Sequence, residues 1–279
     1  MTITTLDGLV SALGNNSSRI VIDKASIANA AIGQFHSLWR ATGQPGQGAI
    51  PTTVANCLNT LTGAMQFAQQ TAPATTYAAY LEAASVVNAV TIEVHDRLMH
   101  LGGLSGTVTT AQTAVVDLHA QIANNNLDAR KGDTNYSDVQ WWLEWYADTG
   151  ATVSNATVNV TYDDASTGDL TAVSLAATRR ASFMQSLNGL IPAAKAGLYI
   201  RRVNSVTLSA STLAAGNFGV TATRLRVSLG LPTANYKWAA DWAALPLSEI
   251  ANSACLFTLM MPGTTSTGIL RGGGKLAHG

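Results

Sequence analysis

The sequence predicts a mainly β protein: an antiparallel β-sandwich, of the jelly-roll or immunoglobulin-like kind, with an N-terminal arm and some helix. Residues 139–148 and 155–163 alternate between two sets of side chains, as half-buried strands do. The segment DTGATVS between them is typical of a hairpin connection. Further strand-like segments follow at a spacing of roughly 8–12 residues, separated by Gly, Asn and Pro turns, which favours a sandwich.

The N-terminal part, residues 1–75, is expected to be an arm with helical and loop regions. Residues 1–24 mix turn signals with short apolar runs, which suits a tether. Apolar residues recur at helical spacing in 25–40 and again in 53–70. The Gly- and Pro-containing segment 41–53 predicts an extended loop between these two helical stretches.

The sandwich domain is expected over residues 76–262. Segment 89–100 alternates like a half-buried strand, 111–123 has helical or loop character, and 124–138 is a long polar connection. The remaining predicted strands are 139–148, 155–163, 170–175, 198–210, 220–230 and 254–261. Pro262 ends the last of them, and residues 263–279 are expected to form a flexible or partner-bound tail.

The composition points to a surface that partners cover. Hydrophobic residues make up 47% of the chain and charged residues only 11%, against roughly 25% charged in typical soluble domains. The net charge of zero hides an asymmetry along the chain. The part of the chain up to Asp169 contains six Lys and Arg residues and fourteen Asp and Glu residues, a net charge of −8. The part after Asp169 contains ten Lys and Arg residues and two Asp and Glu residues, a net charge of +8. This split suits internal complementarity or head-to-tail contact between copies.

Several function classes are disfavoured by what the sequence lacks. No charged and apolar leader opens the chain and no run of about 18 apolar residues occurs, so we expect neither ordinary secretion nor a membrane span. Nucleic acid is a weak candidate partner, because the arginines lie among Ser, Thr and Leu without an aromatic stacking surface. Cys57 and Cys255 are expected to be buried free thiols.

No pattern of residues predicts catalysis, a metal site or a cofactor, and we expect the protein not to be an enzyme. The five-residue spacing of His95 and His100 does not put two ligands on one face. Asp96 is expected to contact Arg97 or another basic residue. The segment GILRGGGKL lacks the spacing and the hydroxyl of a phosphate-binding loop. The pair Asp163 and Asp164 is typical of a solvated turn.

The segment VQWWLEWYAD, residues 139–148, is the most distinctive stretch. Alternation places Trp141 and Trp145 on one face, where burial of each ring would contribute about 2–3 kcal/mol. Trp142 and Tyr146 fall on the other, nominally polar face. Aromatic side chains there could stack on a sugar or lie under the N-terminal region or a neighbouring subunit. Covering by protein is the favoured interpretation.

Five segments resemble a widespread group of structural proteins encoded by tailed bacteriophages. They are FHSLWRATGQPGQGAIP (35–51), VHDRLMHLGGLSGTVTTAQT (94–113), WLEWYADTGATVSNATVNVTYDD (142–164), VNSVTLSAS (203–211) and CLFTLMMPGTTSTG (255–268). The resemblance implies a component of the phage particle, assembled in the bacterial cytoplasm. The preferred role is a head-associated decoration or minor capsid protein that clamps the lattice from outside.

Alternatives stay open at this point: a tail, neck or baseplate component, a receptor-binding fibre piece, or a cellular carbohydrate-binding or enzymatic β-sandwich. The expected partners are the major capsid protein or neighbouring tail proteins, and further copies of the chain, with a trimer as one option. The candidate interface residues are Trp142, Tyr146, Arg201, Arg202, Arg224 and Arg226. Contacts through the C-terminal arginines would weaken as salt rises.

Overall fold

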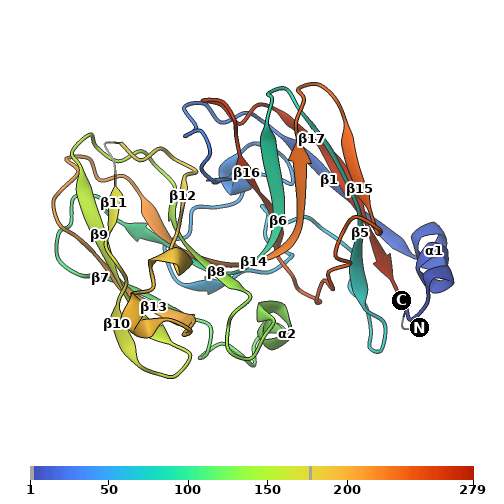
Figure 1. Ribbon diagram of the computed structural model, residues 1–279, viewed down its shortest axis with the longest axis horizontal. Helices are drawn as coiled ribbons and strands as arrows, with labels where there is room; N and C mark the ends of the chain where they lie inside the picture. The colour runs from blue at the N-terminus through green and yellow to red at the C-terminus, as the bar shows by residue number, and fades with distance from the viewer. Residues whose placement is uncertain (1–2, 176–177) are drawn as a thin grey trace. The chain divides into compact units, whose positions relative to one another are not determined.

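The computed structural model describes residues 3–175 and 178–279 and confirms the mainly β fold (Figure 1). Strands hold 43% of the residues and helices 9%, and the strand pairs form several antiparallel sheets. The chain divides into two compact units. Unit 1 contains residues 3–49, Leu58–Asp96 and Leu225–Gly279, and unit 2 contains Ile50–Cys57 and Arg97–Arg224.

One layer of unit 1 is a five-stranded antiparallel sheet. Its strand order is β15 (Trp238–Asp241), β5 (Thr76–Ser85), β17 (Leu270–His278), β1 (Ser17–Lys24) and β3 (Gly43–Gln44). Strand β1 pairs along its whole length with β17, and β17 pairs with β5 on its other side. The two ends of the chain therefore meet in the middle of one sheet.

The opposing layer of unit 1 contains the first part of β6 (Val90–Leu104), paired with β16 (Leu256–Met261), which pairs with β2 (His36–Ser37). One apolar core includes residues of both layers, for example Ile22 and Leu81 from the five-stranded sheet and Ile92 and Leu256 from the other. Because each layer buries one face against the other, unit 1 is a sandwich. The 3-10 helix η1 (Leu38–Arg40) adds the fully buried Trp39, whose ring meets Phe257 edge-on.

Unit 2 has a sheet ordered β10 (Thr167–Asp169), β9 (Ser154–Tyr162), β13 (Ile200–Leu208) and β7 (Gln112–Asp117), with β11 (Val173–Leu175) also on β9. A second group pairs β12 (Met184–Ser186) with β8 (Val139–Trp145), and β8 with the first part of β14 (Phe218–Leu231). The short β4 (Ala55–Asn56) pairs with the second part of β6. Short helices α2 (Leu127–Lys131), η2 (Asn188–Leu190) and η3 (Ala193–Lys195) lie in the connections.

The predicted core role of Trp141 and Trp145 is confirmed. Both side chains are fully buried, and the Trp141 Nε1 donates a hydrogen bond of 2.8 Å to the carbonyl of Ile200 on β13. The Trp145 ring lies 5.5 Å from the ring of Phe183 and stacks on Phe218 at 5.7 Å. The hydrogen bond anchors β8 to the facing sheet of unit 2, whereas the aromatic packing joins it to its neighbours in its own sheet, at β14 and just before β12.

The predicted C-terminal tail, residues 263–279, is wrong as a tail, because residues 270–278 form the central strand β17. Glycines 272–274, a composition typical of a loop, allow β17 to pack closely between the backbones of β5 and β1. A Cβ atom at any of the three would collide with a backbone oxygen of Glu82, Ile20 or Tyr80 on the flanking strands. Glycine in a strand interior often marks such a close approach of another backbone.

The predicted N-terminal arm is also wrong, and the division at residues 75 and 262 is not the one the structure shows. Residues 6–15 form helix α1 (Leu6–Asn15), whose N-cap is Thr5, and β1 follows at once. Ile20 and Ile22 alternate with exposed Arg19 and Val21, so this strand buries its apolar face in the core. The period-2 pattern was present in the sequence but short.

Three expected helical stretches form other structure. Residues 25–40 hold only β2 and η1, residues 53–70 hold β4 and turns, and part of 111–123 forms β7. Segment 53–70 contains several Thr, Asn and Gly residues, which are weak helix formers. The five strands expected between 139 and 261 with the longest patterns are confirmed as β8, β9, β13, β14 and β16. Among the described residues no helix is both long and apolar enough to cross a membrane.

Candidate functional site

Trp142 and Tyr146, the leading candidates for a partner interface, are buried within unit 2. Their exposed fractions are 4% and 6%. The Trp142 Nε1 donates a hydrogen bond of 2.9 Å to Thr223 Oγ1 on β14. The Tyr146 ring and the carbonyl of Pro51 both lie so close to Gly102 on β6 that a Cβ atom there would meet both of them. The prediction of a partner contact at this pair is therefore wrong, because the chain's own strands and the segment around Pro51 cover it, and a sugar cannot stack there.

A polar network explains why aromatic and charged residues share this buried face. Arg97 on β6 donates from Nη2 to Glu144 Oε2 at 2.5 Å and to Tyr146 Oη at 2.9 Å. Its Nε donates to His100 Nδ1 at 2.9 Å. The Thr221 hydroxyl donates to the same Glu144 oxygen at 2.6 Å. A buried ion pair persists when further hydrogen bonds satisfy it in this way.

The electrostatics of the network fit a structural role. Burial, the largest single effect, would lower the pKa of Arg97, but the charge and hydrogen bond of Glu144 together with the neighbouring Tyr146 and Cys57 outweigh it, so the pKa of Arg97 is raised. Burial and then the Glu144 charge raise the pKa of Tyr146 well above its ordinary value. Arg97 therefore stays charged and Tyr146 stays neutral at physiological pH. With Arg97 fully buried and Glu144 only 1% exposed, the groups hold the strands of unit 2 together and do not face solvent.

The four candidate arginines differ in environment. Arg226 is buried in unit 1, 3.8 Å from Asp96 Oδ2, so its predicted role in a partner contact is wrong. The expected contact of Asp96 with a basic residue is thereby confirmed, with Arg226 as the partner. Arg224 and Arg202 are partly exposed and pair within unit 2, with Asp138 at 2.7 Å and Asp117 at 3.4 Å. Arg201 borders a pocket of unit 2.

The lengthwise charge split is compensated inside the fold. Six ion pairs among the described residues join an acid before residue 170 to a base after it: Asp23–Arg271, Glu82–Lys237, Asp96–Arg226, Asp117–Arg202, Asp138–Arg224 and Asp148–Arg180. Counted over the ranges above, unit 1 carries seven bases and seven acids, and unit 2 carries nine of each, so each nets zero. Internal complementarity, one of the two alternatives, is thus present in the structure.

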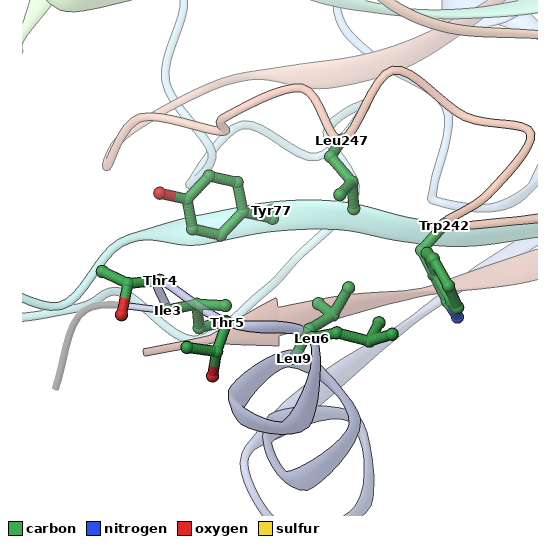
Figure 2. A pocket seen from close by; sticks show the side chains of 8 residues that line it. All are labelled: Ile3, Thr4, Thr5, Leu6, Leu9, Tyr77, Trp242 and Leu247. Atoms are coloured by element: carbon green, nitrogen blue, oxygen red, sulfur yellow. The ribbon is translucent and has the colours of Figure 1, made fainter.

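An apolar pocket of unit 1 lies beside helix α1 (Figure 2). It has a volume of about 350 Å³ and is lined by Ile3, Thr4, Thr5, Leu6, Leu9, Tyr77, Trp242 and Leu247. Figure 2 shows the α1 side chains on one side and Tyr77, Leu247 and Trp242 on the other. Leu9 packs into a small cluster with Ala79 and Ala277, which fixes the helix on the sheet. Leu6 and Val10, in contrast, are 53% and 56% exposed.

The tether expected over residues 1–24 does not foresee this pocket, because a tether has no helix that could form one of its walls. The signal was available in Thr5 followed by apolar residues at 6, 9, 10 and 13, since a threonine N-cap before helical apolar spacing marks a helix start. The Thr5 side chain accepts a hydrogen bond from the Gly8 N–H at 3.1 Å. The cap and the Leu9 contact together place Leu6 at the mouth of the pocket.

Unit 1 contains three buried histidines that are held neutral. Burial lowers the pKa of His36 to about 4, and His36 Nε2 accepts the N–H of Ala31 at 2.9 Å. Burial also lowers the pKa of His95 and of His278. The His278 ring bridges two strands, with Ser18 Oγ at 2.7 Å and Thr76 Oγ1 at 2.9 Å. Protonation of these rings is therefore disfavoured in the folded state.

Acidification is expected to destabilise unit 1 in a defined pH window. In the unfolded chain His36 binds a proton near the ordinary histidine pKa of 6.5, whereas in the folded protein its pKa is about 4. Between these values the unfolded state binds more protons, so stability present above 6.5 is lost as pH falls to 4, by up to about 3 kcal/mol for this residue. Urea titrations from pH 4 to 8 measure this slope.

The matched variant for that experiment is His36→Gln, which keeps an acceptor for the Ala31 N–H but does not titrate. Its unfolding free energy should depend less steeply on pH than that of the unaltered protein, with the remaining slope due in part to His95 and His278. An identical slope in both proteins would show that His36 is not the group responsible.

Both cysteines are buried free thiols, as expected. Among residues 3–175 and 178–279, no group of three or more His, Cys, Asp and Glu side chains is placed to hold a metal ion.

Comparison with known proteins establishes no family. No family model matches the chain, and no curated protein matches it. A structure of infectious bursal disease virus, Gx strain, is 9% identical and covers 94% of this chain and 80% of its own, with a TM-score of 0.17. The Gt strain is 11% identical with the same coverage and TM-score. Likeness at this level supports neither a shared fold nor a shared function, so the resemblance to tailed-phage proteins rests on the sequence segments alone.

Proposed function

We propose that this chain is a structural component of a virus particle, specifically a decoration or minor capsid protein on the head of a tailed phage. Its partners in this role are the major capsid protein and further copies of the chain, and it performs no catalysis and uses no cofactor. The sequence segments that resemble tailed-phage structural proteins support this proposal. The structure supports it through the character of the surface.

The observation that carries the proposal is the scarcity of free charge on that surface. The chain has 32 charged residues, and seven of them are buried: Lys24, Asp96, Arg97, Arg130, Lys131, Glu144 and Arg226. Many of the remainder are engaged in the ion pairs described above. Large apolar side chains are meanwhile exposed, among them Leu6, Val10 and Ile32. Soluble monomers keep more charge on their surfaces, so this balance favours a protein covered by partners.

The pocket at α1 is the surface we assign to a neighbouring capsid subunit. Leu6 and Val10 project from the helix beside a hollow that Trp242 and Leu247 line. An apolar side chain of the neighbour would cover all four residues, which suits the low charge of this surface. No specific observation favours a tail, neck or baseplate position, and Trp142 and Tyr146, the pair considered for sugar stacking, are buried.

The double variant Leu6→Ser/Val10→Ser tests this assignment in assembled particles. Both side chains are more than half exposed, so the isolated protein should keep its melting temperature. Loss of about 1–2 kcal/mol of burial per residue predicts roughly 30- to 1,000-fold weaker association. The number of copies that remain on purified particles after dilution, counted by quantitative mass spectrometry, measures it.

The control variant is Leu213→Ser, which removes an apolar side chain that is 80% exposed on a loop of unit 2. Its copy number should match that of the unaltered protein. Equal occupancy of the double variant and the unaltered protein would contradict the assignment of α1 to the capsid contact.

A further inference from the structure

A second pocket, in unit 2, has the features of a small-ligand site. Its volume is about 290 Å³, and it is bordered by α2 and by residues around the ends of β7, β9 and β13. The side chains that matter are His119, Asp128, Lys131, Tyr136, Asp163 and Arg201. Pockets for drug-sized ligands span roughly 300–1,000 Å³. This pocket is therefore suited to a single small ring and not to a long chain.

Most of the pocket's polar groups are held in place by other parts of unit 2. Tyr136 is 5% exposed, and its hydroxyl lies 2.9 Å from His119 Nδ1. Lys131 Nζ lies 3.1 Å from Asp128 Oδ1 and donates to the carbonyl of Asp133 at 2.9 Å. Asp163 Oδ1 accepts the N–H of Tyr199 at 2.9 Å. Groups fixed in this way lose little further entropy when a ligand binds.

Arg201 differs from these groups. Its side chain is partly sheltered at the pocket, yet it forms no hydrogen bond or ion pair with any described residue. Its neighbour on β13, Arg202, is paired with Asp117. A guanidinium offers five donors in a fixed planar arrangement. The donors of Arg201 are thus available to a ligand in the pocket.

The charges of the pocket limit the ligand class. Lys131 and Arg201 are balanced by Asp128 and Asp163, so the formal charges of these four side chains sum to zero. A simple anion would gain from Arg201 but would meet two carboxylates. A neutral molecule with several hydroxyls satisfies both kinds of group, because each hydroxyl can accept from a guanidinium and donate to a carboxylate.

We infer that this pocket binds one neutral saccharide residue. Its hydroxyls accept hydrogen bonds from Arg201 and donate to Asp163, and its apolar C–H edge lies towards Tyr136 and towards Ile122, which also lines the pocket. The site lies apart in sequence from Trp142 and Tyr146, the pair first considered for sugar stacking. This inference does not depend on the proposed function, since a particle protein and a cellular protein could each carry such a pocket.

The test uses the full chain and ligand-observed NMR titrations with D-galactose, N-acetyl-D-glucosamine, D-glucuronate and inorganic phosphate. At least one of the two neutral sugars should bind, and Arg201→Gln should weaken that binding by about tenfold or more, as expected for loss of hydrogen bonds from a charged donor. Arg202→Gln, one residue away on the same strand and paired with Asp117, should bind as the unaltered protein does.

Three outcomes would overturn the inference: no binding of either neutral sugar, binding of glucuronate or phosphate alone, or equal losses in the Arg201 and Arg202 variants. Unchanged melting temperatures establish that both variants fold. The Leu6→Ser/Val10→Ser protein should keep its sugar binding, so failure of the capsid assignment and failure of this inference give separate results.

Discussion

Replacing Arg97 by methionine is expected to lower the free energy of unfolding of the protein by about 3–5 kcal/mol, because it leaves Glu144 charged and buried without its partner. Glu144 is 1% exposed, and Arg97 is the cation within 2.5 Å of its Oε2. Equilibrium urea denaturation, followed by tryptophan fluorescence, measures the change. Tyr146 and Thr221 would keep their hydrogen bonds to Glu144 and so moderate the loss.

Two comparisons separate this effect from simple loss of a side chain. Arg180→Met removes an ion pair of similar length, 2.6 Å to Asp148, but both partners are more than 40% exposed, and such pairs contribute about 0–1 kcal/mol. Arg97→Met/Glu144→Met removes both buried charges and should be more stable than Arg97→Met alone. A cost for Arg97→Met no larger than for Arg180→Met would refute the structural role of the network.

Trp145→Ala is expected to cost about 3–5 kcal/mol, the range for deleting a buried aromatic side chain. The Trp145 ring is fully buried between Phe183 and Phe218, so its removal leaves a cavity at the centre of unit 2. Thermal and urea unfolding of the purified variant measure the loss. The matched control is Trp238→Ala on the edge strand β15, where the ring is 42% exposed and the cost should be about 1 kcal/mol or less. Equal costs would contradict the placement of Trp145 in the core.

The strands with strong alternation were predictable because a half-buried strand imposes a period of two on its own sequence. Residues 155–163 show this clearly, and the structure has strand β9 at Ser154–Tyr162. Strand β17 was not predictable in the same way. Its glycines have no side chain to show a pattern, and their reason lies in the backbones of β1 and β5, which are distant in sequence. Local signals there pointed to a loop.

The burial and the partners of the candidate site residues were harder to predict. Alternation correctly separated Trp141 and Trp145 from Trp142 and Tyr146, but only the fold shows that β8 is buried on both faces. The position of Glu144 on the nominally polar face predicts a solvent-exposed side chain. In the structure Arg97, 47 residues away in the sequence, neutralises its charge inside the protein. Arg226 looked like a free base for the same reason, because its partner Asp96 lies 130 residues earlier in the sequence.

The most direct test of the proposed particle role is immunogold labelling of purified, intact virus particles with antibodies raised against this chain. A position on the outside of the head predicts gold over the capsid surface of intact particles, and a matching density in a particle reconstruction. Gold confined to the tail would place the protein in the tail, neck or baseplate and contradict the head assignment. Particles without label or density, when antibodies detect the chain in infected cells, would contradict a role in the particle.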